Sequence, residues 1–214
     1  MNKLFFLIPI ILGVAAVASL SLTLTSQEPT EDFDESQLNP IYDTGFTYYD
    51  IEKIQTTLAE HNIVVSTPIP ITDHTIGQYC KFFDKGLPKT VEYCTTTSVL
   101  DSKGNALGNI NIGGDTNSPI LAIANLETST LESNQDEVFA VFEAIIETLA
   151  CDCWEEESED FESISAWLNT VHAFYLDSEK RNIKSQIDNL GNTRITLEIT
   201  SKENSILQTL IVQK

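Results

Sequence analysis

The chain has 214 residues, a hydrophobic content of 42% and a formal net charge of −20, from 32 acidic and 12 basic side chains. The hydrophobic content argues against wholesale disorder, and the length suffices for one folded domain with a core of its own. A surface this negative repels phosphate groups and anionic lipid headgroups, so nucleic acid is not expected as a partner.

The beginning of the chain predicts a membrane-targeting helix. No charged residue lies between Lys3 and Glu28, and residues 4–24 are mostly Leu, Ile, Phe, Val and Ala. A run of about 20 such residues is long enough to cross a bilayer as a helix. Because the positive charge precedes the run and carboxylates follow it, residues 1–3 are expected in the cytoplasm and the remainder outside it.

A cleaved signal peptide is the alternative interpretation of this segment. Ala16-Val17-Ala18 resembles a small-residue cleavage motif. The apolar run continues past this motif as far as Leu24, which favours a retained anchor. The chain is therefore expected to be a single-pass cell-membrane protein with its domain on the extracytoplasmic side, or a secreted protein if the segment is cut.

Residues 25–47 are predicted to form an acidic linker, and residues 48–214 a globular domain. The linker is rich in polar residues and carboxylates, includes two prolines and lacks a helical apolar period. The domain is expected to open with a helix over about 49–61, because Ile51, Ile54 and Leu58 recur at helical spacing.

Pro68 and Pro70 are then expected to interrupt regular structure. Strand-like segments follow at about 75–84, 90–100, 106–113 and 119–126. The turn residues Gly86-Leu87-Pro88 separate the first two segments, and residues 101–105 separate the next two, so two hairpins are predicted.

Two helices are expected in the middle of the domain. Ser133 and Asp136 form a possible capping box for the first helix, and the second runs over about 158–176. Their predicted apolar faces comprise Val138, Val141, Phe142, Ile145 and Leu149 in the first, and Phe161, Ile164, Trp167, Leu168, Val171, Phe174 and Tyr175 in the second.

The end of the chain predicts three strands, at 183–187, 193–200 and 206–212. The whole order of elements indicates an α+β fold. We expect an antiparallel sheet of hairpins and a C-terminal three-stranded meander, packed with an N-terminal helix and a central helical hairpin.

The four cysteines, Cys80, Cys94, Cys151 and Cys153, are predicted to form disulfides, because their number is even and the expected compartment is oxidising. If the 75–84 and 90–100 strands pair symmetrically about Leu87, Cys80 lies opposite Cys94. This pairing leaves Cys151 and Cys153 to bond with each other. The alternative is that Cys151 and Cys153 bond to Cys80 and Cys94 and join the helical hairpin to the sheet.

An acidic cluster follows the first central helix, in a stretch from Gly104 through Glu179 that contains no lysine or arginine. Three interpretations are open: a solvated surface, a Ca²⁺ site, or a docking surface for a basic protein to which Trp154 contributes an anchor. The candidate cation or partner surface consists of Asp152, Glu155, Glu156, Glu157, Glu159 and Asp160.

No motif of a hydrolase nucleophile, a metalloprotease or a phosphate-binding loop is present in the sequence. No cofactor other than Ca²⁺ is therefore suggested, and no catalytic residue can be named. The leading hypothesis is a membrane-anchored, extracytoplasmic, non-catalytic module that binds a protein or a cation. The alternative is an enzyme or redox accessory protein that uses the Cys151–Cys153 turn or a carboxylate-bound cation.

Overall fold

A computed structural model describes residues 46–71, 73–84, 87–150, 154, 161–179 and 181–214. The strands are β1 (Val64–Val65), β2 (Ile69–Ile71), β3 (Lys81–Asp84), β4 (Leu87–Thr90), β5 (Tyr93–Leu100), β6 (Ala106–Gly114), β7 (Pro119–Thr128), β8 (Ile183–Leu190), β9 (Thr193–Ser201) and β10 (Ile206–Gln213). The helices are α2 (Asp50–Glu60), α3 (Ile76–Tyr79), α4 (Gln135–Leu149) and α6 (Ile164–Asp177), with a short 3-10 turn, η2 (Asp73–Thr75).

Eight strands form one antiparallel sheet in the order β1-β5-β6-β7-β10-β9-β8, with β2 also paired to β5. The C-terminal meander β8-β9-β10 joins the sheet through the pairing of β10 with β7. The α+β prediction is confirmed, including the N-terminal helix α2, the central helices α4 and α6, and the meander.

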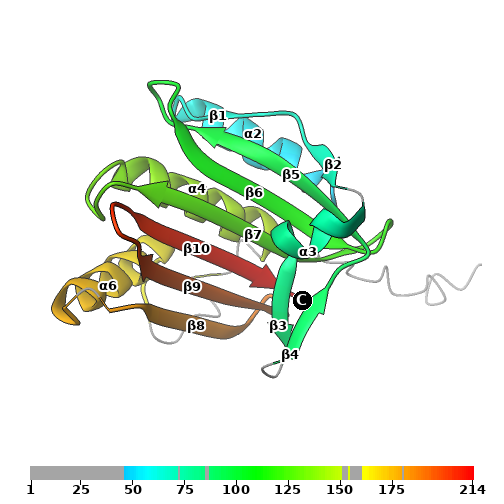
Figure 1. Ribbon diagram of the computed structural model, residues 1–214. Helices are drawn as coiled ribbons and strands as arrows, with labels where there is room; N and C mark the ends of the chain where they lie inside the picture. Colours follow the sequence, from blue (N-terminus) through cyan, green and yellow to red (C-terminus); the bar gives the residue numbers. More distant parts are fainter. Residues whose placement is uncertain (1–45, 72, 85–86, 151–153, 155–160, 180) are drawn as a thin grey trace, which may run out of the picture. The chain divides into compact units, whose positions relative to one another are not determined.

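The main core lies between the sheet and the helices α2, α4 and α6, which Figure 1 shows behind the sheet. Strands alternate their side chains between the two faces, so every second residue of β10 points into this core. Ile206, Leu210 and Val212 are buried there, while Leu207, Thr209 and Ile211 lie on the opposite face. We call that opposite side the open face.

A second, smaller core lies on the open face. Residues 73–84 and 87–91, which we call the flap, include η2, α3, β3 and β4, and they cover part of this face (Figure 1). Apolar side chains of the flap and the sheet are buried together there: Ile71, Cys80, Phe82, Val91, Cys94, Leu121 and Ile123. The flap therefore gives the open face an apolar part and leaves the remainder polar.

The prediction of a continuous strand over 75–84 is wrong. Ile76–Tyr79 is helical, and β3 begins only at Lys81. The expectation that Pro68 and Pro70 interrupt regular structure is also wrong, because Pro70 lies within β2. β2 pairs with β5 alone, and an edge strand tolerates a residue that lacks an N–H donor.

Three details of the predicted helices also differ. α4 begins after Asn134, which makes no side-chain cap bond, so the capping box at Ser133 is wrong. α6 begins at Ile164 rather than near 158, because the Ser163 hydroxyl accepts a hydrogen bond from the Ala166 N–H and caps it there. Phe174 is exposed, since the buried residues of α6 recur at helical spacing on another side.

Candidate functional site

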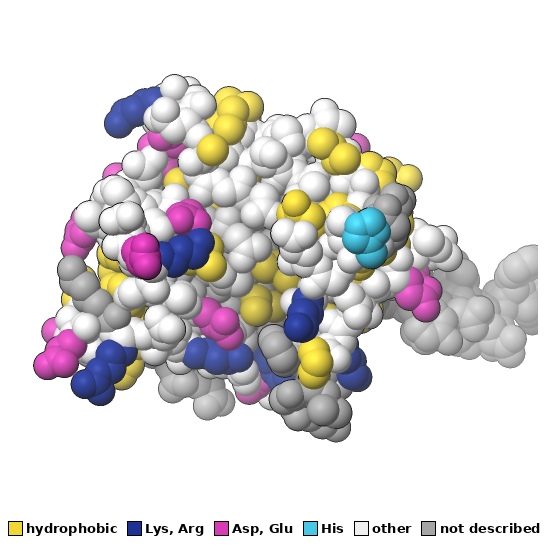
Figure 2. Space-filling model, viewed as in Figure 1, with side chains coloured by type: hydrophobic (Ala, Val, Ile, Leu, Met, Phe, Trp, Pro, Cys, Tyr) yellow, Lys and Arg dark blue, Asp and Glu magenta, His cyan; other side chains and the backbone are white. Residues whose placement is uncertain are grey.

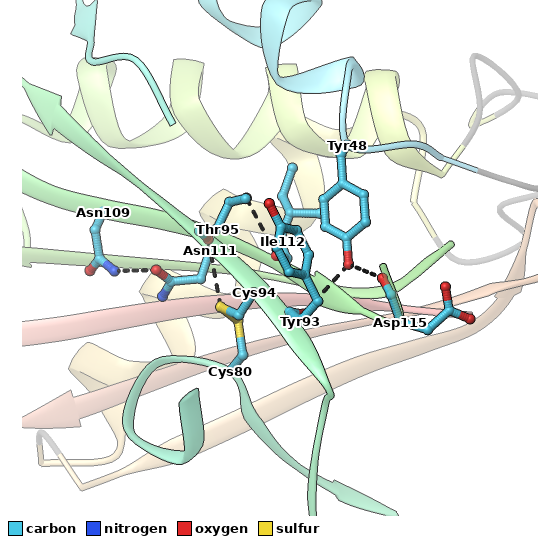
Figure 3. Close-up of a disulfide and its surroundings, with 9 residues drawn as sticks. All are labelled: Tyr48, Cys80, Tyr93, Cys94, Thr95, Asn109, Asn111, Ile112 and Asp115. Atoms are coloured by element: carbon cyan, nitrogen blue, oxygen red, sulfur yellow. Dashed lines mark hydrogen bonds between the residues drawn. A yellow bond between two sulfur atoms is a disulfide. The ribbon is translucent and has the colours of Figure 1, made fainter. Parts of the chain in front are cut away.

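A disulfide joins Cys80 to Cys94, as predicted, with 6.2 Å between their Cα atoms (Figure 3). The geometry differs from the predicted hairpin. β3 pairs with β4 rather than with β5, and Cys80 lies at the carboxyl end of α3. Both cysteines are fully buried in the second core. The disulfide therefore fastens the flap to the open face instead of bridging two neighbouring strands.

Gly113 makes room for this attachment. Cys94 pairs with Gly113 across β5 and β6. A Cβ atom at Gly113 would lie 2.8 Å from Val91 Cγ2 and 3.0 Å from Cys80 Sγ. Real Cβ atoms do not approach other atoms so closely, so a larger residue would push the flap away from the sheet.

A groove of about 240 Å³ lies between the flap and the uncovered part of the open face. Figure 2 shows this hollow, with hydrophobic side chains at its floor and both basic and acidic side chains beside it. The flap contributes Gln78, Tyr79, Lys81 and Phe82, and the sheet contributes Ile123, Asn125, Lys184, Gln186, Arg194, Thr196, Glu198, Thr209, Ile211 and Gln213. We call it the open-face groove.

The charges of the open-face groove come in exposed pairs. Lys184 Nζ lies 3.1 Å from Glu198 Oε1, and Arg194 Nε lies 2.6 Å from Asp188 Oδ1. The bond from Arg194, followed by one from Gln186, lowers the pKa of the Asp188 carboxyl below its ordinary value. The groove is lined by Lys81, Lys184, Arg194 and Glu198, and the Asp188 carboxylate lies against Arg194 at its margin.

A second hollow, of about 630 Å³, lies where the start of α2 meets β5 and the turn between β6 and β7. Its lining includes Tyr48, Tyr49, Tyr93 and Pro68, and we call it the tyrosine groove. The rings of Tyr48 and Tyr93 meet edge to face, with 5.1 Å between their centres. Glu52 is the one charged residue among the described side chains that line it.

Tyr48 is held rigidly in the tyrosine groove. Its hydroxyl donates to the Asp115 carbonyl at 2.6 Å, and more weakly to the Tyr93 carbonyl at 3.5 Å (Figure 3). Partial burial, with Tyr93 and Asp115 nearby, raises the pKa of Tyr48 to about 12. The Asp115 carboxylate accepts the backbone N–H groups of Asn117 and Ser118, which fixes the turn beneath the ring. Tyr48 therefore remains a neutral hydrogen-bond donor in this position.

The two grooves lie on opposite faces of the sheet. Cys94 points to the open face and reaches Cys80, while Tyr93 and Thr95 point the other way and line the tyrosine groove. Figure 3 shows the disulfide on one side of this strand and Tyr48 approaching from the other. β5 thus lines the tyrosine groove on one side and holds the disulfide of the flap on the other.

Within the main core, His172 is the one described histidine that is buried. Its Nε2 lies 2.8 Å from Gln208 Oε1, and its ring meets Phe139 edge to face. Burial lowers the pKa of His172, and the Gln208 bond opposes this effect only in part. Gln208 Nε2 has no hydrogen-bond partner among the described residues. The pair lies away from both grooves.

The remaining predicted site residues lie outside the described residues: Cys151, Cys153, Asp152, Glu155, Glu156, Glu157, Glu159 and Asp160. Trp154 is described, and it does not fit the anchor of a docking surface. Its side chain is buried in the main core, its Nε1 donates to the Phe161 carbonyl, and its ring lies 6.0 Å from that of Trp167.

No group of three or more His, Cys, Asp or Glu side chains in the described part of the chain is arranged to hold a metal ion. No helix among the described residues is long and apolar enough to cross a membrane, and the predicted anchor at 4–24 lies outside them.

Comparison with protein-family models, with curated proteins and with solved structures found no match to the chain. The interpretation of its function therefore depends on the two grooves themselves.

Neither groove was predicted from the sequence. Polar residues alternate along β8 and β9, as in Lys184, Gln186 and Asp188, and this alternation could have indicated one uncovered face. The tyrosines offered no such signal, because Tyr48 and Tyr93 lie 45 residues apart and meet only in the folded domain.

Proposed function

We propose that the chain is a membrane-anchored, extracytoplasmic, non-catalytic module that binds a basic protein partner through the tyrosine groove. The observation that carries this proposal is the lining of the groove, with three tyrosines and a proline around a hollow of about 630 Å³. Tyrosine combines a large apolar ring with a polar tip and loses little conformational entropy on binding, and it is enriched at protein interfaces.

The exposure of Tyr49 supports this proposal. Its side chain is 78% exposed at the groove, beside the rigidly held Tyr48. A fixed aromatic surface next to an accessible ring is the arrangement from which binding hot spots are built. The exposed carboxylate of Glu52 and the net charge of −20 favour a partner segment with basic side chains.

A photo-crosslinking amino acid in place of Tyr49 tests the proposal in the membranes of the source cells. We expect one protein adduct from position 49, with the cross-link mapped to a basic segment of the partner. Phe174 is the matched control position, because it is an aromatic residue, 63% exposed, on α6 and away from the groove. The same adducts from both positions, or none from position 49, would rule the groove out as a docking site.

We also propose that residues 4–24 are retained as the membrane anchor of this module. The uncharged apolar run over residues 4–24 supports retention of the segment in the membrane. The intact mass of the protein extracted from membranes should include residues 1–24. A mass that matches a chain beginning after Ala18 would show instead that the segment is a cleaved signal peptide.

The acidic cluster at Asp152 and residues 155–160 remains a candidate for Ca²⁺ or for part of the partner surface. Ca²⁺ that binds the folded state would raise the melting temperature, because a ligand selective for the native state stabilises it. Replacement of the cluster with Asn and Gln should abolish that rise. A melting temperature independent of Ca²⁺ would remove the cation hypothesis.

A further inference from the structure

We propose that the open-face groove binds a small organic carboxylate with an apolar body, and that Arg194 holds its carboxylate. This site lies on the opposite face of the sheet from the tyrosine groove and has a different chemistry, so it does not depend on the proposed docking of a protein. Its position beneath the flap is fixed by the Cys80–Cys94 disulfide.

The first argument is the distribution of charge. The whole chain has 12 basic side chains against 32 acidic ones, yet the open-face groove is lined by Lys81, Lys184, Arg194 and Glu198, with Asp188 against Arg194. Basic side chains are thus three of the five charged groups at this groove, whereas acidic side chains predominate in the chain as a whole. A carboxylate ligand therefore meets less repulsion here than it would over an acidic part of the surface.

The second argument is the hydrogen-bonding capacity of Arg194. Its guanidinium group has five N–H donors, and Nε donates to Asp188, which leaves the Nη groups for another acceptor. The planar arrangement of these donors matches the two oxygens of a carboxylate. Arg194 and Asp188 are both about half exposed, at 48% and 49%, and such a pair stabilises a fold little. Rearrangement of the pair around a ligand therefore costs little.

The third argument is the apolar surface next to Arg194. Across the sheet, Arg194 pairs with Gln213, and the next residue on the same face of β10 is Ile211, which pairs with Ile123. Diagonal neighbours on a sheet face lie about 7–8 Å apart, within reach of one small ligand. Tyr79 and Phe82 of the flap form the wall above this floor. A ligand can thus place its carboxylate on Arg194 and its apolar body over Ile211.

The size of the groove limits the ligand. Its volume of about 240 Å³ lies below the roughly 300–1,000 Å³ of pockets for drug-sized molecules. A single ring or a short branched chain with one carboxylate fits this space. Lys184 lies farther along the strands, at the far margin of the groove, where the Glu198 carboxylate offsets its charge.

Fluorine NMR on the full chain in a non-ionic detergent provides the test, with 4-(trifluoromethyl)benzoate as the probe. The neutral 4-(trifluoromethyl)benzamide has nearly the same shape and is the matched control ligand. We expect saturable binding of the benzoate, and at least about tenfold weaker binding of the amide, because a charge-assisted hydrogen bond is lost.

Four variants assign the binding to the groove. Arg194→Gln should weaken benzoate binding by about tenfold, and Asp188→Asn should strengthen it about two- to fivefold by removing the competing carboxylate. Lys202→Gln is the matched control, because Lys202 forms an equally exposed pair with Glu127 outside the groove. Tyr49→Ala should also leave benzoate binding unchanged, which separates this site from the tyrosine groove.

Three results would overturn the proposal. They are benzoate affinity within twofold of the native value in Arg194→Gln, equal affinity for the amide, and no saturable binding of the benzoate to the native chain. Each variant alters an exposed side chain, so its melting temperature should equal that of the native protein and confirm that it folds.

Discussion

Cys80 at the end of α3 is bonded to Cys94 in β5, and this covalent link fastens the flap to the open face of the sheet. The two residues are separated by 14 positions in the sequence, and both are fully buried. The strand that receives the link supports the tyrosine groove on its other side. The attached flap therefore forms a wall of the open-face groove. The strand to which it is attached, β5, also lines the tyrosine groove.

Removal of this disulfide should destabilise the domain. In the variant Cys80→Ala/Cys94→Ala, we expect the free energy of unfolding to fall by about 3 kcal/mol, as for a closed loop of about 15 residues. Urea unfolding measured under oxidising conditions provides the value. The native protein should lose a similar amount in dithiothreitol.

The same variant controls for the other two cysteines, because it retains Cys151 and Cys153. Any further loss of stability that dithiothreitol causes in this variant reports on those residues alone. A double variant as stable as the native protein would contradict the account of the flap.

Gly113→Ala should loosen the flap without removing the disulfide. The new Cβ atom would overlap Val91 and Cys80, and overpacking of this kind costs about 1–3 kcal/mol. Hydrogen exchange should quicken in β3 and β4 more than in β9 and β10. Val91→Ala, combined with Gly113→Ala, should recover part of the loss, because it removes the nearest clashing atom. Exchange that quickens equally in all four strands would contradict a local effect.

Asn134 joins the start of α4 to the hairpin between β5 and β6. Its backbone has a positive φ of 55°, and its Nδ2 donates to Asp101 Oδ2 at 3.0 Å. Asn134→Gly should lose only the hydrogen bond, at a cost of about 1 kcal/mol, while Asn134→Ala should lose about 1–2 kcal/mol more because alanine disfavours this conformation. Chemical denaturation of both variants gives the comparison, and equal stabilities would contradict it.

Asp101 provides a second measurement on the same variants. Hydrogen bonds from Asn105, Asn134 and the backbone N–H of Lys103 lower its pKa to about 2. Loss of the Asn134 bond should raise this pKa in both variants, as followed by NMR of the carboxyl group. An unchanged pKa would show that Asn134 does not contribute.

The buried His172 should make stability depend on pH. Its folded-state pKa is lowered from 6.5, so the native state favours the neutral ring. The contribution of this residue is complete above about pH 6.5 and falls as the pH drops below that value, because the unfolded chain then binds the proton more readily. The loss of stability from pH 7.5 to pH 5 should be larger in the native protein than in His172→Gln. An equal loss in both would contradict the lowered pKa.

Much of the fold could be predicted because the periodic segments are long. Ile51, Ile54 and Leu58 of α2, and the alternating residues of β9 and β10, are buried as their spacing indicates. The flap could not be predicted in the same way. Its helical turn at Ile76–Tyr79 is short, and its apolar residues are buried only because the open face offers them a surface.

The cysteine pairing illustrates the same limit. The assumption that two strands pair symmetrically about Leu87 predicted the correct disulfide partners for the wrong reason. Cys80 instead approaches Cys94 from the end of a helix that lies over the sheet. The candidate sites depend still more on tertiary structure. Tyr48 meets Tyr93, 45 residues away, and Arg194 shares the open-face groove with Tyr79 of the flap, only in the folded domain.

The affinity of the partner for the tyrosine groove tests the central claim most directly. Once the protein cross-linked at position 49 is purified, its dissociation constant can be measured for the native chain, Tyr49→Ala and the control Phe174→Ala. A hot-spot tyrosine contributes about 2 kcal/mol or more, so we predict about thirtyfold weaker binding for Tyr49→Ala and no change for the control. Equal affinities of the native chain and Tyr49→Ala would contradict the claim that this groove is where the protein binds its partner.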